Sequence, residues 1–367
     1  MTNGSDTQLK EAPLSASGAV QVPGTKSTLG ENLLLCHDRA SGLSAAIAVD
    51  DTTLGPGLGG VRWKSYDSFD VAVDEACRLA RVMTLKNALA DIPYGGAKSV
   101  ILRQGESGWT QPDRTAQLLA FAGFVNRLGG AYIPGVDMGT SVADLATIAS
   151  ASPWASCDHV DPSPATAEGV YFAIAAAIRQ RLHRDLNGIK VVVQGVGHVG
   201  AALAERLNDA GATVVISDVD AVRAATVAHR FGGTTIDPGV AHAQPCDVFA
   251  PCGPARVLNA RSIDAMRCAL VVGAANDVLS ERADAALLAQ RGITYVPDFV
   301  TNAGGVIQIH SERAKWDGEE LAQALMRIGQ ITIELLQSAD DDHHVLPLTV
   351  AEALASDRLG HLVTIPD

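Results

Sequence analysis

The chain has 367 residues, more than one hydrophobic core usually serves, so two domains are expected. It carries 28 basic and 41 acidic side chains, a net charge of −13, with no basic run, which argues against nucleic acid as a partner. Six scattered cysteines without a CxxC pair indicate no disulfide framework and no metal site, and favour a reducing cytoplasm. No stretch reaches the roughly 20 apolar residues of a membrane span.

Residues 1–30 are polar and rich in Ser, Gly and Pro, as in a flexible tail. Residues 31–160 combine short apolar runs with helical spacings of three and four, which predicts an α/β domain. Lys86 and Lys98 of this domain bracket a Gly-Gly pair that lets the chain double back, so both are expected to reach one pocket. One ammonium would bind a substrate carboxylate. The other, desolvated beside a like charge, would have a lowered pKa and act as a base.

A proline-containing hinge at 161–164 marks the domain boundary near residue 160 and leads into an alanine-rich helix. Strands then alternate with helices over 161–324, which predicts a doubly wound parallel sheet of the Rossmann type. The expected strands are 189–194, 213–218, 246–251, 269–275 and 293–298. A helix is expected over 319–337, and residues 325–367 are expected to pack back on the first domain, with a cleft between the two domains.

The motif GVGHVG follows the first of these strands and opens a helix. Asp218 comes 23 residues after Gly195, at the end of the next strand, as in a dinucleotide-binding fingerprint. Asp218 would accept hydrogen bonds from a ribose 2′-hydroxyl and repel a 2′-phosphate, which favours NAD over NADP. The cofactor loop is therefore assigned to Gly195, Gly197, His198, Val199 and Gly200.

Several motifs occur in one order: GPGLGGVRW, MTLKNALADIPYGGAKSVI, GVDMGTSVADL, SPATAEGV, CDVFAPC, VVGAANDVL and VPDFVTNAGGVI. In this order and spacing the chain resembles the glutamate/leucine/phenylalanine/valine dehydrogenase family over roughly residues 45–340. The resemblance implies reversible, NAD-dependent oxidative deamination of an L-amino acid to a 2-oxo acid and ammonia. We also expect a homo-oligomer.

The resemblance also implies roles for individual residues. Lys86, with the backbone of Gly60, would bind the substrate carboxylate. Lys98 would activate the water that attacks the imine, and Asp137 would carry protons to and from the amino group. Asn302 would form a hydrogen bond with the substrate. Thr166 would contact the nicotinamide carboxamide, and Asn276 would lie near the nicotinamide ribose.

Substrate choice is inferred from the expected pocket walls. Leu58 offers an apolar wall where glutamate-specific relatives usually place a lysine, so a charged substrate side chain would be poorly served. Gly135 leaves room for a large group, and Thr332 and Leu335 are expected to line the same pocket. Phenylalanine is the first choice, with leucine, valine or another aromatic amino acid as alternatives.

Two other classes of function explain fewer of these residues. A 2-hydroxy acid dehydrogenase would leave the pair Lys86 and Lys98 unexplained. A non-catalytic NAD-binding sensor would keep the glycine loop but would not need both lysines together with Asp137.

Overall fold

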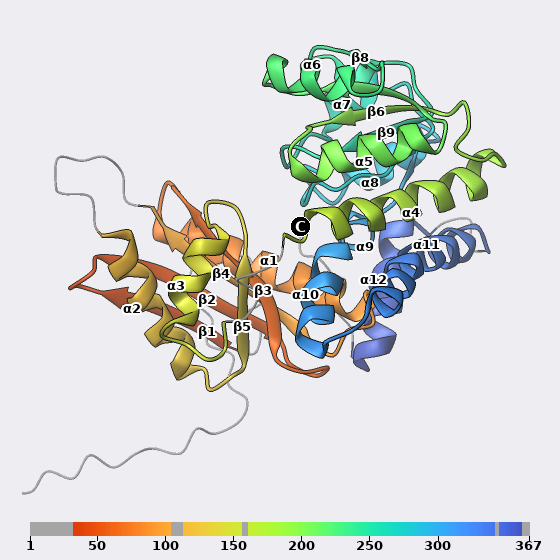
Figure 1. The fold of residues 1–367 in the computed structure, drawn as a ribbon. Helices are drawn as coiled ribbons and strands as arrows, with labels where there is room; N and C mark the ends of the chain where they lie inside the picture. Colours follow the sequence, from red (N-terminus) through yellow and green to blue (C-terminus); the bar gives the residue numbers. More distant parts are fainter. Residues whose placement is uncertain (1–31, 104–112, 156–160, 342–344, 362–367) are drawn as a thin grey trace, which may run out of the picture.

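A computed structural model describes residues 32–103, 113–155, 161–341 and 345–361. The first domain is a five-stranded sheet of order β1-β2-β4-β3-β5 (Figure 1). Strands β4, β3 and β5 run parallel, whereas β1 and β2 pair in the antiparallel manner and β2 is antiparallel to β4. Its elements are β1(Asn32–Asp38), β2(Leu43–Asp51), β3(Gly57–Lys64), α1(Phe69–Leu89), β4(Gly95–Leu102), α2(Arg114–Arg127), β5(Tyr132–Val136) and α3(Val142–Ala149).

Helix α1 contributes residues of the first domain to the cleft between the domains. The Ser68 side chain caps its amino terminus by accepting a hydrogen bond from the Val71 amide. Ala76 and Ala80, one helical turn apart, are buried in the core that joins α1 to the sheet. Small residues at this face let the helix lie close to the strands. Its last turn, which contains Lys86, is buried at the junction with the second domain.

The second domain is built on a six-stranded parallel sheet of order β11-β10-β9-β6-β7-β8. Chain order reverses between β6 and β9, so the carboxyl ends of these two strands form the crevice where such sheets bind ligands. Its strands are β6(Lys190–Gln194), β7(Thr213–Ser217), β8(Thr234–Thr235), β9(Val248–Pro251), β10(Leu270–Val271) and β11(Thr294–Tyr295). Its helices up to β11 are α4(Ser163–Leu182), α5(His198–Asp209), α6(Ala221–His229), the short 3-10 turn η1(Ala241–Ala243), α7(Ala260–Ala265) and α8(Asp284–Gln290).

Four helices complete the chain and connect the two domains (Figure 1): α9(Asp298–Thr301), α10(Gly304–Ala314), α11(Gly318–Asp341) and α12(Pro347–Leu359). Helix α11 packs along α4, whereas α12 packs against α1. Arg358 of α12 donates hydrogen bonds to the carbonyls of Ala88 and Leu89, 2.6 and 3.0 Å away, at the end of α1. It is therefore mainly α12, rather than the whole chain after residue 325, that returns to the first domain.

The strands expected in the second domain are present, with some shorter than expected. The strand expected over 269–275 comprises Leu270–Val271 and the one over 293–298 comprises Thr294–Tyr295. Strand β8 was not expected from the sequence. The expected tail at 1–30 lies outside the described residues. None of the helices in the described parts of the chain is both long and apolar enough to cross a membrane.

Gly59 provides a test of how closely β3 and β4 pack. A Cβ atom at Gly59 would lie 1.6 Å from the Ala97 carbonyl oxygen, so Gly59→Ala requires the backbone to move. We expect it to lower the free energy of unfolding by at least about 3 kcal/mol. Gly123→Ala in α2, where a Cβ meets no atom within 4 Å, should instead raise it by up to about 1 kcal/mol. Urea unfolding measures both, and equal effects would contradict the packing described.

Candidate active site

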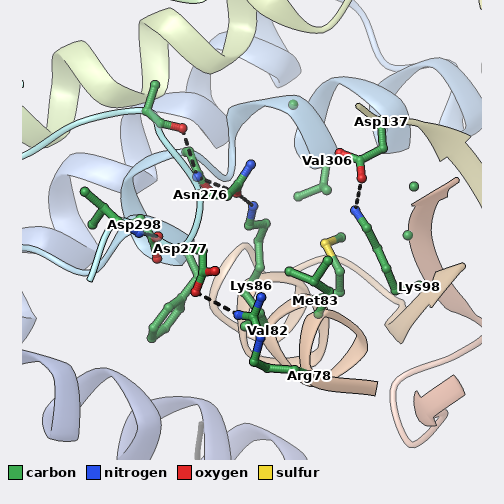
Figure 2. A pocket seen from close by; sticks show the side chains of 18 of the residues that line it. Arg78, Val82, Met83, Lys86, Lys98, Asp137, Asn276, Asp277, Asp298 and Val306 are labelled. Carbon is green, nitrogen blue, oxygen red and sulfur yellow. Dashed lines mark hydrogen bonds and ion pairs between the residues drawn. The ribbon is translucent and has the colours of Figure 1, made fainter. Parts of the chain in front are cut away.

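A cavity of about 350 Å³ lies between the two domains (Figure 2). The first domain lines it with α1 and with strands β3, β4 and β5 and the residue that follows β5. The second domain lines it with the loop after β10 and with helices α9 and α10. Its polar lining includes Lys86, Lys98, Asp137, Asn276, Asp298 and Asn302. The two lysines that bracket the Gly-Gly pair therefore face one cavity.

Strand register and a close helix contact bring the two lysines together. Lys86 is in α1 and Lys98 is in β4, on which α1 lies. A Cβ atom at Gly96 would be 2.2 Å from the Thr84 amide nitrogen, so only glycine lets α1 approach β4 this closely. The helix then directs Lys86 toward the cavity that Lys98 enters from the sheet.

Lys98 and Asp137 form an ion pair beside Gly60 of strand β3, which lies between β4 and β5 in the sheet. Val61 pairs with Ser99 of β4 and with Val136 of β5, so Lys98 and Asp137 emerge on either side of this part of β3. Lys98 Nζ is 2.9 Å from Asp137 Oδ2. A Cβ atom at Gly60 would lie 2.6 Å from Asp137 Cβ and 3.2 Å from Lys98 Nζ. The ion pair therefore depends on the missing side chain at this position.

Burial and neighbouring charge shift the pKa values of these groups. Burial lowers the pKa of Lys98, and the Arg62 guanidinium lowers it further, while Asp137 opposes both effects. Burial alone would raise the pKa of Asp137, but the charges of Lys98 and Arg62 outweigh it and hold that pKa well below its usual range. Burial lowers the pKa of Lys86 to about 8, although Asp298 partly opposes the shift. The site thus holds an ionised carboxylate and two amines that lose protons more readily than surface lysines.

Lys86 reaches across the cleft to the second domain. Its Nζ donates a hydrogen bond to Asn276 Oδ1, 3.1 Å away, and Asn302 Nδ2 donates to the same oxygen at 2.8 Å. Asn302 Oδ1 is buried and has no partner among the described residues. An unpaired buried acceptor is costly unless a ligand satisfies it. Lys86 and Asn302 therefore offer a cation for a carboxylate and an acceptor for an amino group.

The glycine loop after β6 fits a dinucleotide cofactor. Gly195 has φ +93°, and a Cβ atom at Gly200 would lie 1.9 Å from the Gly195 carbonyl oxygen, so both positions need glycine. A Cβ at Gly197 meets no atom within 4 Å, which leaves open space before α5. The amino terminus of α5 has no side-chain cap, so its amide groups are available to a pyrophosphate.

Asp218 follows β7, beside this loop. Its Oδ2 accepts a hydrogen bond from the Val196 amide at 2.7 Å and its Oδ1 one from the Asp220 amide at 2.9 Å, so the carboxylate is fixed in place. Arg223 Nη2 lies 2.6 Å from Oδ1. This arrangement fits recognition of a ribose hydroxyl, with Arg223 already engaged by the carboxylate.

Other predicted cofactor contacts differ in their surroundings. Thr166 and Val199 line the cavity together with Asn276. The Thr166 hydroxyl donates to the Pro162 carbonyl at 2.8 Å. The His198 side chain is largely exposed, and its Nδ1 is 3.8 Å from Asp161 Oδ2. His198 therefore belongs to the outer rim of the loop.

The prediction that Thr332 and Leu335 line the substrate pocket is wrong. Both are fully buried in α11, among the residues that pack on α4, and neither borders the cavity. The Thr332 hydroxyl donates to the Ile328 carbonyl within its own helix, 2.8 Å away. The buried face of α11 therefore meets α4 and not the cavity.

Helix α10 supplies the apolar wall instead. Val306 and Ile309, three residues apart on one helical face, line the cavity together with Leu58 and Met83. A Cβ atom at Gly135 would lie 3.8 Å from Ile309 Cδ1, an ordinary contact. Val306 and Ile309 were not predicted to line the pocket, although Val306 directly follows the sequence AGG and their i, i+3 spacing marks one helical face.

Two family models match the chain in succession. The Glu/Leu/Phe/Val dehydrogenase dimerisation domain matches residues 32–153, and the Glutamate/Leucine/Phenylalanine/Valine dehydrogenase model matches residues 160–226 and 223–360. Leucine dehydrogenase from Geobacillus stearothermophilus is 36% identical over 344 residues, which cover 90% of each chain. Phenylalanine dehydrogenase from Thermoactinomyces intermedius is 34% identical over 345 residues, 91% of this chain and 93% of that protein. The crystal structure of L-tryptophan dehydrogenase from Nostoc punctiforme superposes with a TM-score of 0.77 at 33% identity, covering 90% of this chain and 96% of that one.

The lowered pKa of Lys86 gives a direct prediction. After reductive methylation with ¹³C, the NMR signal that Lys86→Met removes should titrate with a midpoint near pH 8, because burial favours the neutral amine. A midpoint above pH 10 would contradict the burial of Lys86 in solution.

Proposed function

Because this chain belongs to the glutamate/leucine/phenylalanine/valine dehydrogenase family and is an amino acid dehydrogenase, we propose that its substrate is a hydrophobic L-amino acid, with L-phenylalanine the first choice. Members of this family are NAD(H)-dependent dehydrogenases. The proposed reaction is reversible oxidative deamination to the 2-oxo acid and ammonia.

One observation carries the choice of a hydrophobic substrate. The wall formed by Leu58, Met83, Val306 and Ile309 is apolar, and Gly135 opposite Ile309 leaves space that a side chain would fill. A carboxylate placed there would lose its hydration without gaining a partner from these four side chains. A phenyl or isobutyl group would gain from burial at the same place.

The polar and charged side chains of the site would bind the substrate and transfer protons. Lys86 would anchor the substrate carboxylate with help from the Gly60 backbone, and Asn302 Oδ1 would accept a hydrogen bond from the amino group. Asp137 would take a proton from that group, and Lys98, as a neutral amine, would take one from the attacking water. NAD, when bound, serves as the hydride acceptor. Closure of the cleft would exclude bulk water from the reacting atoms.

We also propose that the enzyme is a homo-oligomer that assembles through its first domain. The model that matches residues 32–153 is described as a dimerisation domain. Strand β1 lies at one edge of the sheet, and Leu35 on it is 52% exposed. Within the described residues no strand pairs with the outer edge of β1, and an edge strand with an exposed apolar side chain is a favourable place for a second copy to pair.

Initial rates of NADH formation over a panel of L-amino acids, with NAD and NADP, test the proposal. We expect phenylalanine to have the highest kcat/KM, leucine or tryptophan a lower one and glutamate almost none. The reverse reaction should consume NADH with phenylpyruvate and ammonia. A preference for glutamate would refute the pocket assignment, and a leucine or tryptophan preference would refute the first choice alone.

Substitutions of the two lysines are expected to change different kinetic constants. Lys86→Met removes a charged partner of the substrate carboxylate, so KM for the amino acid should rise about 10- to 100-fold. Lys98→Met removes a base, so kcat should fall by a factor of about 10² to 10⁴ and lose its rise with pH. Asp137→Asn should resemble Lys98→Met. Steady-state kinetics from pH 6 to 10 separates the two effects, and equal, mild losses at all three positions would contradict these roles.

Gly135→Ala tests the pocket wall. The added methyl would meet Ile309 Cδ1 at 3.8 Å and so would narrow the pocket without straining the protein. We expect the ratio of kcat/KM for phenylalanine to that for leucine to fall about 5- to 150-fold, equivalent to about 1–3 kcal/mol. The ratio cancels damage to folding or to the cofactor site, and Gly123→Ala is the control. An unchanged ratio would place the substrate side chain elsewhere.

A further inference from the structure

Arg62 is a third cation, partly buried, beside the two buried lysines. It lies two residues after Gly60 in β3, so it points to the same face of the sheet, beside Asp137 at the end of the neighbouring strand β5. Arg62 Nε donates a hydrogen bond to Asp137 Oδ2 at 2.8 Å, the same oxygen that lies 2.9 Å from Lys98 Nζ. Among the described residues, no donor contacts Oδ1. The two cations therefore share one oxygen of the carboxylate and leave the other for a ligand.

Glu75 of α1 fixes the other end of the guanidinium. Arg62 Nη1 donates to Glu75 Oε1, and the second oxygen of Glu75 lies 3.7 Å from Lys64 Nζ at the edge of the group. The Arg62 side chain is only 12% exposed and that of Glu75 16%. A buried guanidinium between two carboxylates has little freedom to turn. Glu75 thus sets the direction from which Arg62 approaches Asp137.

The charges around this group come from several elements. Those that act on Lys98, Asp137 or Arg62 are Glu75 and Lys86 of α1, Asp298 of α9 through Lys86, Lys64 of β3 through Glu75, and the tyrosines Tyr66 and Tyr132. Arg62 and Lys98 together balance Glu75 and Asp137. Within this set, the Arg62 charge lowers the pKa of Asp137 and that of Lys98, whereas Glu75 raises the pKa of Lys98.

We propose that Arg62 is a positioning residue for proton transfer: it holds Asp137 by Oδ2 so that Oδ1 faces the substrate amino group, and it prevents Lys98 from being the sole partner of that carboxylate. The inference rests on the proposed function, because it takes Asp137 and Lys98 as the groups that move protons. A substrate ammonium must lose a proton before hydride can leave Cα. Arg62 keeps the acceptor of that proton ionised and aimed, and it favours the neutral form of Lys98.

The test compares the pH dependence of kcat and kcat/KM for deamination in Arg62→Met, Arg62→Lys and the control Arg81→Met. Arg81 is also partly buried and pairs with a carboxylate, Asp50, 3.2 Å away, but it does not border the cavity. Loss of the Arg62 charge should move the acidic limb of the profile to higher pH, because the pKa values of both Asp137 and Lys98 rise. We expect kcat at pH 8 to fall at least about tenfold, with a smaller change in KM.

Arg62→Lys, which keeps the charge, should restore the position of the acidic limb. Arg81→Met should lower the thermal unfolding midpoint while leaving the limb in place. The inference would be overturned if folded Arg62→Met kept the acidic limb at the wild-type pH. It would also be overturned if the limb moved equally far in Arg62→Lys and Arg62→Met. The first result would show that Arg62 only supports the sheet, and the second would show that its charge does not set the position of the limb.

Glu75→Gln provides an independent test and decides the matter if Arg62→Met does not fold. Removing this anion should move the acidic limb to lower pH, opposite to the effect of Arg62→Met, because Glu75 raises the pKa of Lys98. An unmoved limb, or one displaced to higher pH, would overturn the inference. Failure of the wild-type enzyme to form NADH from any hydrophobic amino acid would instead refute the proposed function, so the two failures are distinguishable.

Discussion

The absence of a side chain at residue 60 is the constraint on which the rest of the site depends. Lys98 and Asp137 flank strand β3 and meet at 2.9 Å, and any Cβ at Gly60 would press on both. Because the strands are parallel and in fixed register, a lysine from one neighbour and an aspartate from the other are delivered to this point without any loop having to fold over it.

The electrostatics of the site are inseparable from the arrangement of the two domains. Lys86 is buried because the second domain covers it, and burial is the main cause of its lowered pKa. Its hydrogen bond to Asn276, and the ion pair of Arg78 with Asp277 at 2.7 Å, both cross the cleft. A wider cleft would return water to these amines and raise their pKa values. The packing of the second domain on Lys86 thus helps to set how readily this amine loses its proton.

Much of this arrangement could be predicted from the sequence, because local signals determine it. The glycine loop, the alternation of strands and helices, and the two lysines around Gly-Gly all act over short stretches of chain. The direction in which α11 packs depends on contacts between distant segments, so local signals could not predict it. Thr332 and Leu335 were therefore assigned to the cavity wall. Val306 and Ile309 of α10 form that wall instead. Arg62 was missed for a related reason: its partners come from β5 and α1, and only the fold brings them together. Periodicity identifies a buried face, but tertiary packing decides what that face meets.

We propose that this cleft removes hydride from Cα of a hydrophobic amino acid. The most direct measurement follows the label from L-phenylalanine deuterated at Cα, with mass spectrometry of all products. We expect the deuterium to appear on the reduced cofactor, with phenylpyruvate and ammonia released in equal amounts. Unlabelled reduced cofactor, or label retained in unreacted phenylalanine while glutamate is consumed, would contradict it.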